Sequence, residues 1–229
     1  MDLKTLFKTT ACAVAISCSA VGAQAATISF DLQGNDGGRF SSLPSEFSLT
    51  QGGLTATFDA RSFSSATQAN GIVTSGTVQD GHIGRYYGGA GVVNSSSDGS
   101  HTVDGRGWDD FVEITFSAMV EIKEISFGYY DGYDNFRILT DASGDGEIGV
   151  GDAYGSNVNV SQNSPYTGFN GLLTNVFAVA AFGDYDSWKL KSITVEYDDT
   201  PPPAVIPLPA AGWLLLGAFG GMAALRRKR

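Results

Sequence analysis

VEIKEISFGY at residues 120–129 and WKLKSITVEY at residues 188–197 share one pattern of apolar side chains. In each stretch, apolar and polar residues alternate, but the alternation moves by one position at a lysine, Lys123 or Lys191. Apolar residues at every second position predict a β-strand with one face in the core. A strand that continued straight past the lysine would turn its later apolar residues to solvent, so we expect a β-bulge or a corner at each lysine.

Apolar residues also alternate with polar ones elsewhere in residues 26–200, as in residues 54–58 and 112–116. These runs are short, are separated by Gly, Ser, Asn and Asp, and do not recur at helical spacing. In the second run, Glu113 and Thr115 are expected to face solvent while their neighbours face the core. We therefore predict an all-β body, a single β-sandwich of jelly-roll-like type.

Residues 1–25 have the three parts of a secretory signal peptide. Lys4 and Lys8 give a basic start, a run of small apolar residues follows, and Ala23 and Ala25 form an AxA cleavage site. A buried helix at this position would need one polar face, and only Thr and Ser interrupt the apolar run. The body is therefore expected to be exported.

Both cysteines of the chain, Cys12 and Cys18, lie inside this signal peptide. Lipidation at Cys18 is an alternative, although Ala15 stands where a lipoprotein signal usually has Leu. Cleavage after Ala25 would leave no thiol, which excludes disulfides, thiolate nucleophiles and cysteine-bound zinc in the mature protein. Residues 26–200 are long enough for one domain held together by a hydrophobic core.

The expected body is strongly acidic. Of the 14 basic and 24 acidic residues in the chain, residues 26–200 hold 8 and 23, so their net charge is −15. A field of this sign repels nucleic acid and attracts cations. Nucleic acid is therefore not expected as a partner, and solubility outside the cell explains most of the acidity.

Residues 201–229 read as a tail with several parts. Three prolines open a stiff spacer at residues 201–204. Residues 208–225 carry no charge, and these 18 residues, at about 1.5 Å each, reach about 27 Å as a helix, enough to cross a bilayer. A basic stop follows, made up of Arg226, Arg227, Lys228 and Arg229. By the positive-inside rule, the C-terminus stays in the cytoplasm while the body faces outward.

A proline-rich motif lies at the outer boundary of this span. It reads VIPLPA and consists of Val205, Ile206, Pro207, Leu208, Pro209 and Ala210. Prolines at this point prevent the helix from continuing outward and leave the backbone extended. Together with the apolar run and the basic stop, the motif makes residues 205–229 resemble the VPLPA-CTERM branch of the PEP-CTERM sorting signals. Ile206 stands where that branch usually has Val.

The resemblance implies that an exosortase, a membrane enzyme with its own catalytic cysteine, recognises the motif and removes the tail. The chain is then a substrate of that reaction, and none of its own residues is catalytic there. Proteins of this kind reach the cell surface or the extracellular matrix of Gram-negative bacteria that make exopolysaccharide, which becomes a candidate partner. A permanent single-pass anchor also fits the span and the basic stop, and it stays open.

The strongest chemical pattern in the body is the loop DASGDGEIGVGD at residues 141–152. It matches a calcium loop of the EF-hand kind and resembles the dockerin version, which ends in Asp. The expected ligands are the side chains of Asp141, Ser143, Asp145 and Asp152 and the backbone carbonyl of Glu147. The flanking sequence does not predict the helices of an EF-hand, and a solvated turn rich in Asp and Gly is the alternative.

Other residues indicate sugar chemistry less specifically. Aromatic candidates for stacking on sugar rings are Tyr86, Tyr87, Trp108, Tyr129, Tyr130 and Tyr133. Three acid pairs that could serve a glycosidase or add metal ligands are Asp109 with Asp110, Asp131 with Asp134, and Asp184 with Asp186. The sequence contains no GxSxG, HExxH, GxGxxG or P-loop motif.

These patterns favour a non-enzymatic surface or matrix protein whose β-sandwich binds glycan or calcium and whose tail is removed by an exosortase. The first alternative is a permanently anchored structural protein, which differs in the fate of residues 205–229. The second alternative is a secreted polysaccharide hydrolase, which needs two carboxylates facing one cleft.

Overall fold

The computed structural model of the protein describes residues 25–38 and 40–197, which cover most of the expected body. The predicted signal peptide, apart from its last residue, lies outside the described residues. The spacer at 201–204, the sorting motif, the membrane span at 208–225 and the basic stop also lie outside them. Those assignments therefore remain predictions.

Nearly all the regular structure consists of β-strands, which confirms the all-β prediction. The strands are β1 (Ala26–Asp31), β2 (Glu46–Gln51), β3 (Leu54–Ala69), β4 (Ile72–Asp80), β5 (His82–Tyr86), β6 (Gly89–Val93), β7 (Val103–Asp104), β8 (Asp109–Gly128), β9 (Asn135–Thr140), β10 (Ala153–Tyr154), β11 (Val158–Asn159), β12 (Leu173–Ala180) and β13 (Ser187–Tyr197). A 3-10 helix, η1, spans Phe40–Ser42, and the single α-helix in the described ranges, α1, spans Val160–Asn163. Within these ranges, no helix has the length and apolar character needed to span a bilayer.

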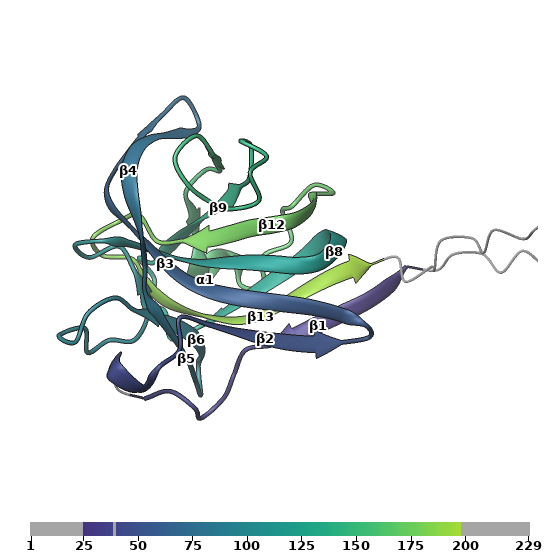
Figure 1. Ribbon diagram of the computed structural model, residues 1–229, viewed down its shortest axis with the longest axis horizontal. Coiled ribbons are helices and arrows are strands. Elements are labelled where there is room, and N and C mark those ends of the chain that lie inside the picture. Colours follow the sequence, from purple (N-terminus) through teal and green to yellow (C-terminus); the bar gives the residue numbers. More distant parts are fainter. Residues whose placement is uncertain (1–24, 39, 198–229) are drawn as a thin grey trace, which may run out of the picture.

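The strands pair in the order β2-β3-β4-β10-β9-β12-β8-β13-β6-β5, while β1 and β7 pair with β13 and β11 pairs with β9 (Figure 1). β8 is the longest strand and contributes to two parts of this sheet. Its residues 109–116 pair with β3, and residues 111–121 pair with β12. Its residues 121–128 pair with β13 instead. β8 therefore joins a layer built on β3 and β12 to a layer built on β13 and β1.

The register of the ladder between β8 and β13 shifts at two places, and each shift leaves one residue out of the pairing. One shift leaves out Lys191 of β13, and the other leaves out Lys123 of β8. Both predicted β-bulges are therefore confirmed, and they lie in the same ladder. The apolar residues on both sides of the bulges are buried: Val120, Ile122, Ile125 and Phe127 in β8, and Trp188, Leu190, Ile193 and Val195 in β13.

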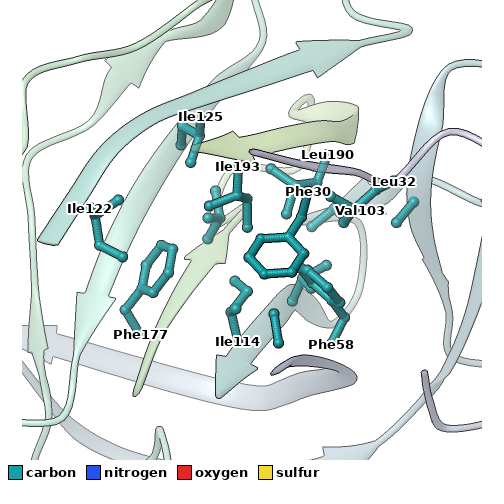
Figure 2. Close-up of a cluster of buried hydrophobic side chains, with 14 of the residues drawn as sticks. Phe30, Leu32, Phe58, Val103, Ile114, Ile122, Ile125, Phe177, Leu190 and Ile193 are labelled. Carbon is teal, nitrogen blue, oxygen red and sulfur yellow. The ribbon is translucent and has the colours of Figure 1, made fainter. Parts of the chain in front are cut away.

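Two rows of apolar side chains meet in the main core (Figure 2). One row crosses β3, β8 and β12 through the cross-strand neighbours Phe58, Ile114 and Phe177. The other row includes Phe30 of β1 and its neighbour Ile193 of β13. The ring of Phe30 lies 6.4 Å from the ring of Phe58 in an edge-to-face arrangement, which aromatic pairs favour. The two rows therefore contact each other within one core.

A second apolar cluster, which includes the side chain of Phe111, lies on the other face of β8. Glu113 lies on this same face, since side chains alternate along a strand, and it is buried. The expectation that Glu113 faces solvent is therefore wrong. The loop at residues 141–152 covers this face, because its Ile148 is buried in the cluster and donates its backbone N–H to Oε2 of Glu113 at 2.9 Å. Arg61 pairs with the same carboxylate oxygen at 3.0 Å.

Candidate functional site

The two described ends of the body lie together at one end of β13, where Ala26 pairs with Tyr197 (Figure 1). β13 has 11 residues, so at about 3.3 Å per residue its other end, at Ser187, lies about 33 Å away. We call that other end of the body the distal end. Three loops meet there: residues 87–88 between β5 and β6, 129–134 between β8 and β9, and 181–186 between β12 and β13.

Five tyrosines on these loops are exposed to solvent. Their exposed fractions are 91% for Tyr87, 71% for Tyr129, 39% for Tyr130, 81% for Tyr133 and 89% for Tyr185. Single exposed apolar residues are common, but a group on adjoining loops is typical of a binding surface. Four of the five were candidates from the sequence, and Tyr185 was missed.

Three pockets, all open to solvent, adjoin along these tyrosines. The first pocket, of about 500 Å³, shares Tyr129 with the second, of about 320 Å³. The second shares Asp131 and Tyr185 with the third, of about 520 Å³. We call this row of pockets the tyrosine groove. Tyr86 is half-buried and lines its first pocket, whereas Trp108 lines none of the three.

Two buried aspartates hold the loops of the groove together. Oδ1 of Asp134 accepts a hydrogen bond from the backbone N–H of Ser187 at 2.8 Å. Oδ1 of Asp186 accepts one from the backbone N–H of Asn135 at 2.9 Å. The exchange is reciprocal, because each carboxylate caps the strand that follows the other loop. We call these two residues the aspartate clamp.

Each residue of the clamp directly follows an exposed tyrosine, in Tyr133–Asp134 and in Tyr185–Asp186. This repeated dipeptide is the sequence signal that could have placed Tyr185 beside the other tyrosines. Of the predicted acid pairs, Asp131 donates its backbone N–H to Asp134. Asp134 and Asp186 also bind across the two loops, which the predicted pairs did not include. Burial raises the pKa of Asp109 to about 7, and the negative charge of Asp184 raises it as well, so the carboxylate at the start of β8 interacts with one on the loop between β12 and β13.

Tyr129 has a backbone φ of 54°, in the left-handed region. This conformation costs a residue with a side chain about 1–2 kcal/mol, and backbone strain of this kind is concentrated at functional sites. The preceding residue, Gly128, packs closely against the turn between β5 and β6. A Cβ on Gly128 would lie 2.2 Å from the carbonyl oxygen of Gly88, so this position requires glycine. The close approach brings Tyr87 and Tyr129 to the same pocket.

Lys189 lies beneath the first pocket. Its ammonium is 4.2 Å from the ring centroid of Tyr86 and 5.6 Å from that of Tyr129, and it donates a hydrogen bond to the carbonyl of His101. Burial lowers the pKa of Lys189 to about 8, although the negative charge of Asp98 raises it. These contacts between a cation and aromatic rings help to fix both tyrosines.

The predicted calcium loop at residues 141–152 connects β9 to β10. Carboxylate oxygens of Asp141, Asp145 and Asp152 lie within 4.8 Å of one another. Calcium binds oxygen at about 2.3–2.6 Å, so ligands on opposite sides of one ion are about 5 Å apart, and these three carboxylates fit one ion. Asp152 is buried and accepts backbone N–H groups at 2.7–3.0 Å, which fixes its position.

The remaining predicted ligands also lie in this loop. The hydroxyl of Ser143 donates to Oδ1 of Asp141 at 3.1 Å. The side chain of Glu147 points to Arg61, at 3.5 Å, so it is directed away from a role as a side-chain ligand. Slight burial raises the pKa of Asp141, but hydrogen bonds from Gly146, Gly144 and Ser143 together lower it below its usual value. Strands, not helices, flank the loop, as expected.

A second acidic cluster was not predicted. It brings carboxylate oxygens of Asp98, Asp104 and Asp110 within 4.8 Å of one another. The sequence paired Asp110 with its neighbour Asp109, but adjacent residues of a strand point to opposite faces. Asp110 is fully buried, and its Oδ1 accepts the hydroxyl of Ser62 at 2.6 Å. Burial raises the pKa of Asp110 to about 8.

The variant Asp110→Asn should remove a pH dependence of stability. Because the pKa of Asp110 is about 8 in the folded protein and about 4 when unfolded, the folded state retains a proton that the unfolded chain loses between these values. The free energy of unfolding of the wild type should therefore fall, relative to that of Asp110→Asn, as the pH rises from 5 to 8. Urea unfolding at both pH values measures this difference, and a relative rise would contradict it.

Comparisons of the chain with protein-family models, with curated proteins and with solved structures find no match.

Proposed function

We propose that the protein is an exported, non-enzymatic surface or matrix protein whose body binds glycan through the tyrosine groove. The observation that carries this proposal is the set of five exposed tyrosines around three adjoining pockets. Sugar rings have apolar faces that stack on aromatic rings, and hydroxyls that bond to amides and carboxylates. Asn135 and Asn157 line the third pocket. The amide of Asn135 donates to the carbonyl of Tyr133 and to Asp186, so the amide of Asn157 and the tyrosine hydroxyls are the groups offered to a sugar.

A jelly-roll-like β-sandwich is the finer architecture that we propose for this body. Two layers that share β8 and pack through Phe30 and Phe58 support it. The placement of the groove also fits a surface protein. The chain continues toward the predicted sorting tail from Tyr197, and the tyrosine groove lies at the opposite end of β13. A body held by its tail would therefore present the groove away from the membrane.

The carboxylates of the groove support binding better than hydrolysis. A glycosidase needs two carboxyl groups free to exchange protons or attack the sugar. Oδ1 of Asp134 accepts the N–H of Ser187, and its Oδ2 accepts the N–H of Asp131. Both oxygens of Asp186 likewise accept backbone N–H groups. These two buried carboxylates therefore have a structural role, which is why we favour a binding protein.

Substitution of Tyr129 should separate binding from stability. Tyr129→Ala and Tyr129→Gly both remove an exposed ring, so both should weaken binding to the best ligand of a glycan array about tenfold. Glycine tolerates the left-handed backbone, so Tyr129→Gly should be about 1 kcal/mol more stable than Tyr129→Ala. Binding titrations and urea unfolding measure the two effects. Leu173→Ala, an exposed residue on β12, is the control, and wild-type affinity in both Tyr129 variants would contradict the proposal.

For trafficking, we propose that an exosortase removes the tail after export, with the C-terminus cytoplasmic until processing. The support is the VIPLPA sequence of residues 205–210, the uncharged run at 208–225 and the basic stop at 226–229. The triproline spacer before the motif would keep it accessible outside the folded body.

Mass spectrometry of the mature surface protein tests this processing. We expect the C-terminal peptide of the wild type to end before Trp213, and the substitution of Pro207 and Pro209 by Ala to leave the tail in place. The matched control is Pro202→Ala, which lies in the spacer outside the motif. Recovery of residues 213–229 in the wild-type surface form would favour the permanent anchor instead.

We also propose that the loop at residues 141–152 binds calcium as a structural ion. The support is the convergence of three carboxylates within 4.8 Å in a loop with EF-hand spacing. An affinity in the millimolar class of extracellular modules is expected.

Calcium should raise the thermal stability of the full-length chain. For a dissociation constant of about 1 mM, 10 mM calcium stabilises the folded state by about 1.4 kcal/mol. The double variant Asp141→Asn and Asp145→Asn should lose this gain, whereas Asp98→Asn, in the second acidic cluster, should keep it. Thermal melting with calcium and with chelator measures it. Equal melting temperatures of the wild type in the two conditions would count against the site.

A further inference from the structure

We propose that the tyrosine groove takes the interior of an uncharged polysaccharide chain. This inference rests on the proposed glycan binding and names its ligand class. It follows from two independent properties of the groove, its continuity and the state of its charged groups.

The groove is continuous and open. Tyr129 is a wall shared by the first and second pockets, and Tyr185 is a wall shared by the second and third. Both rings are largely exposed, so successive sugar units of one chain can meet successive aromatic rings. A site for a chain end would be closed on one side, whereas three pockets open to solvent allow the chain to continue beyond them.

The acidic groups of the groove are largely engaged by the protein itself. Asp134 and Asp186 are buried and use both carboxylate oxygens to accept backbone N–H groups. Oδ1 of Asp131 accepts the N–H of Tyr133 at 2.7 Å. These hydrogen bonds occupy the oxygens of the two buried acids, so Asp131 is the one exposed acid among the described residues that line the three pockets.

The basic groups are also engaged or lie at one edge. The ammonium of Lys189 is buried and donates to the carbonyl of His101 beneath the ring of Tyr86. Lys191 is exposed at the first pocket, and among the described residues that line the second and third pockets there is no Lys or Arg. The net charge of −15 over residues 26–200 further opposes an acidic polymer. Aromatic faces, tyrosine hydroxyls and the amide of Asn157 remain for the ligand, which fits uncharged sugars.

Matched neutral and charged polymers test whether the ligand of the groove is uncharged. Dextran, hydroxyethylcellulose and guar galactomannan, each with its carboxymethylated and cationic derivative, are immobilised, and retention of the full-length chain in mild detergent is measured. We define groove-dependent retention as the retention that is lost in the double variant Tyr129→Ala and Tyr185→Ala. The control variant Leu173→Ala should keep this retention. We expect it to be about tenfold greater on a neutral polymer than on either of its charged derivatives. Greater groove-dependent retention on a charged derivative overturns the inference.

Oligosaccharides of the retained neutral polymer, from one to six units, test binding along the chain. Affinity should rise with length to at least three units, and reduction of the end sugar to its alditol should leave the affinity of a hexamer unchanged. Affinity that is independent of length, or that is lost on reduction of the end sugar, overturns interior binding while leaving the proposed glycan binding intact. The absence of groove-dependent retention on every polymer overturns the proposed function itself, and the inference with it.

Discussion

The two β-bulges of the β8–β13 ladder are the constraint on which the rest of the body depends. Side chains alternate between faces along a strand, so one unpaired residue restores the correct face after the pattern has slipped. Lys123 is the unpaired residue of β8 and Lys191 is that of β13, and both lie in one ladder. Apolar residues before and after both bulges are therefore buried. β8 can then pair with β3 and β12 along its first part and with β13 along its second, which joins the two layers.

The same ladder positions the tyrosine groove. β8 ends at Gly128, directly before the strained residue Tyr129, and β13 begins at Ser187, directly after the clamp residue Asp186. The loops that follow β8 and precede β13 therefore meet at the distal end, where the aspartate clamp ties them together. The first pocket forms beside these loops because Gly128 has no side chain, so the turn between β5 and β6 can approach it closely. Packing of the layers thus determines where the exposed aromatic rings can gather.

The sequence was informative wherever the deciding interaction is local. The strand period and the parity slips at Lys123 and Lys191 predicted an all-β body with two bulges, and the ligand spacing of residues 141–152 singled out a loop whose carboxylates converge. The sequence did not predict features that depend on contacts between segments far apart in the chain. Glu113 is buried by Ile148, which lies 35 residues away, and Tyr185 joins the other tyrosines through a clamp whose partners are 53 and 51 residues apart. The repeated Tyr–Asp dipeptide singles out Tyr185, but no local pattern shows which distant segments these residues bind.

Thermal unfolding of three variants of β13 tests the central role of the bulges most directly. Lys191→Ala keeps the unpaired residue and removes only an exposed side chain, so it should unfold cooperatively at close to the wild-type temperature. Deletion of Lys191 removes the unpaired residue and leaves Leu190, Ile193 and Val195 in regular alternation on one face, so this variant should also unfold cooperatively. Deletion of Thr194, a paired residue, instead turns Val195 away from the core, so cooperative unfolding should be lost. Loss of cooperative unfolding on deletion of Lys191, or its retention on deletion of Thr194, would contradict the account.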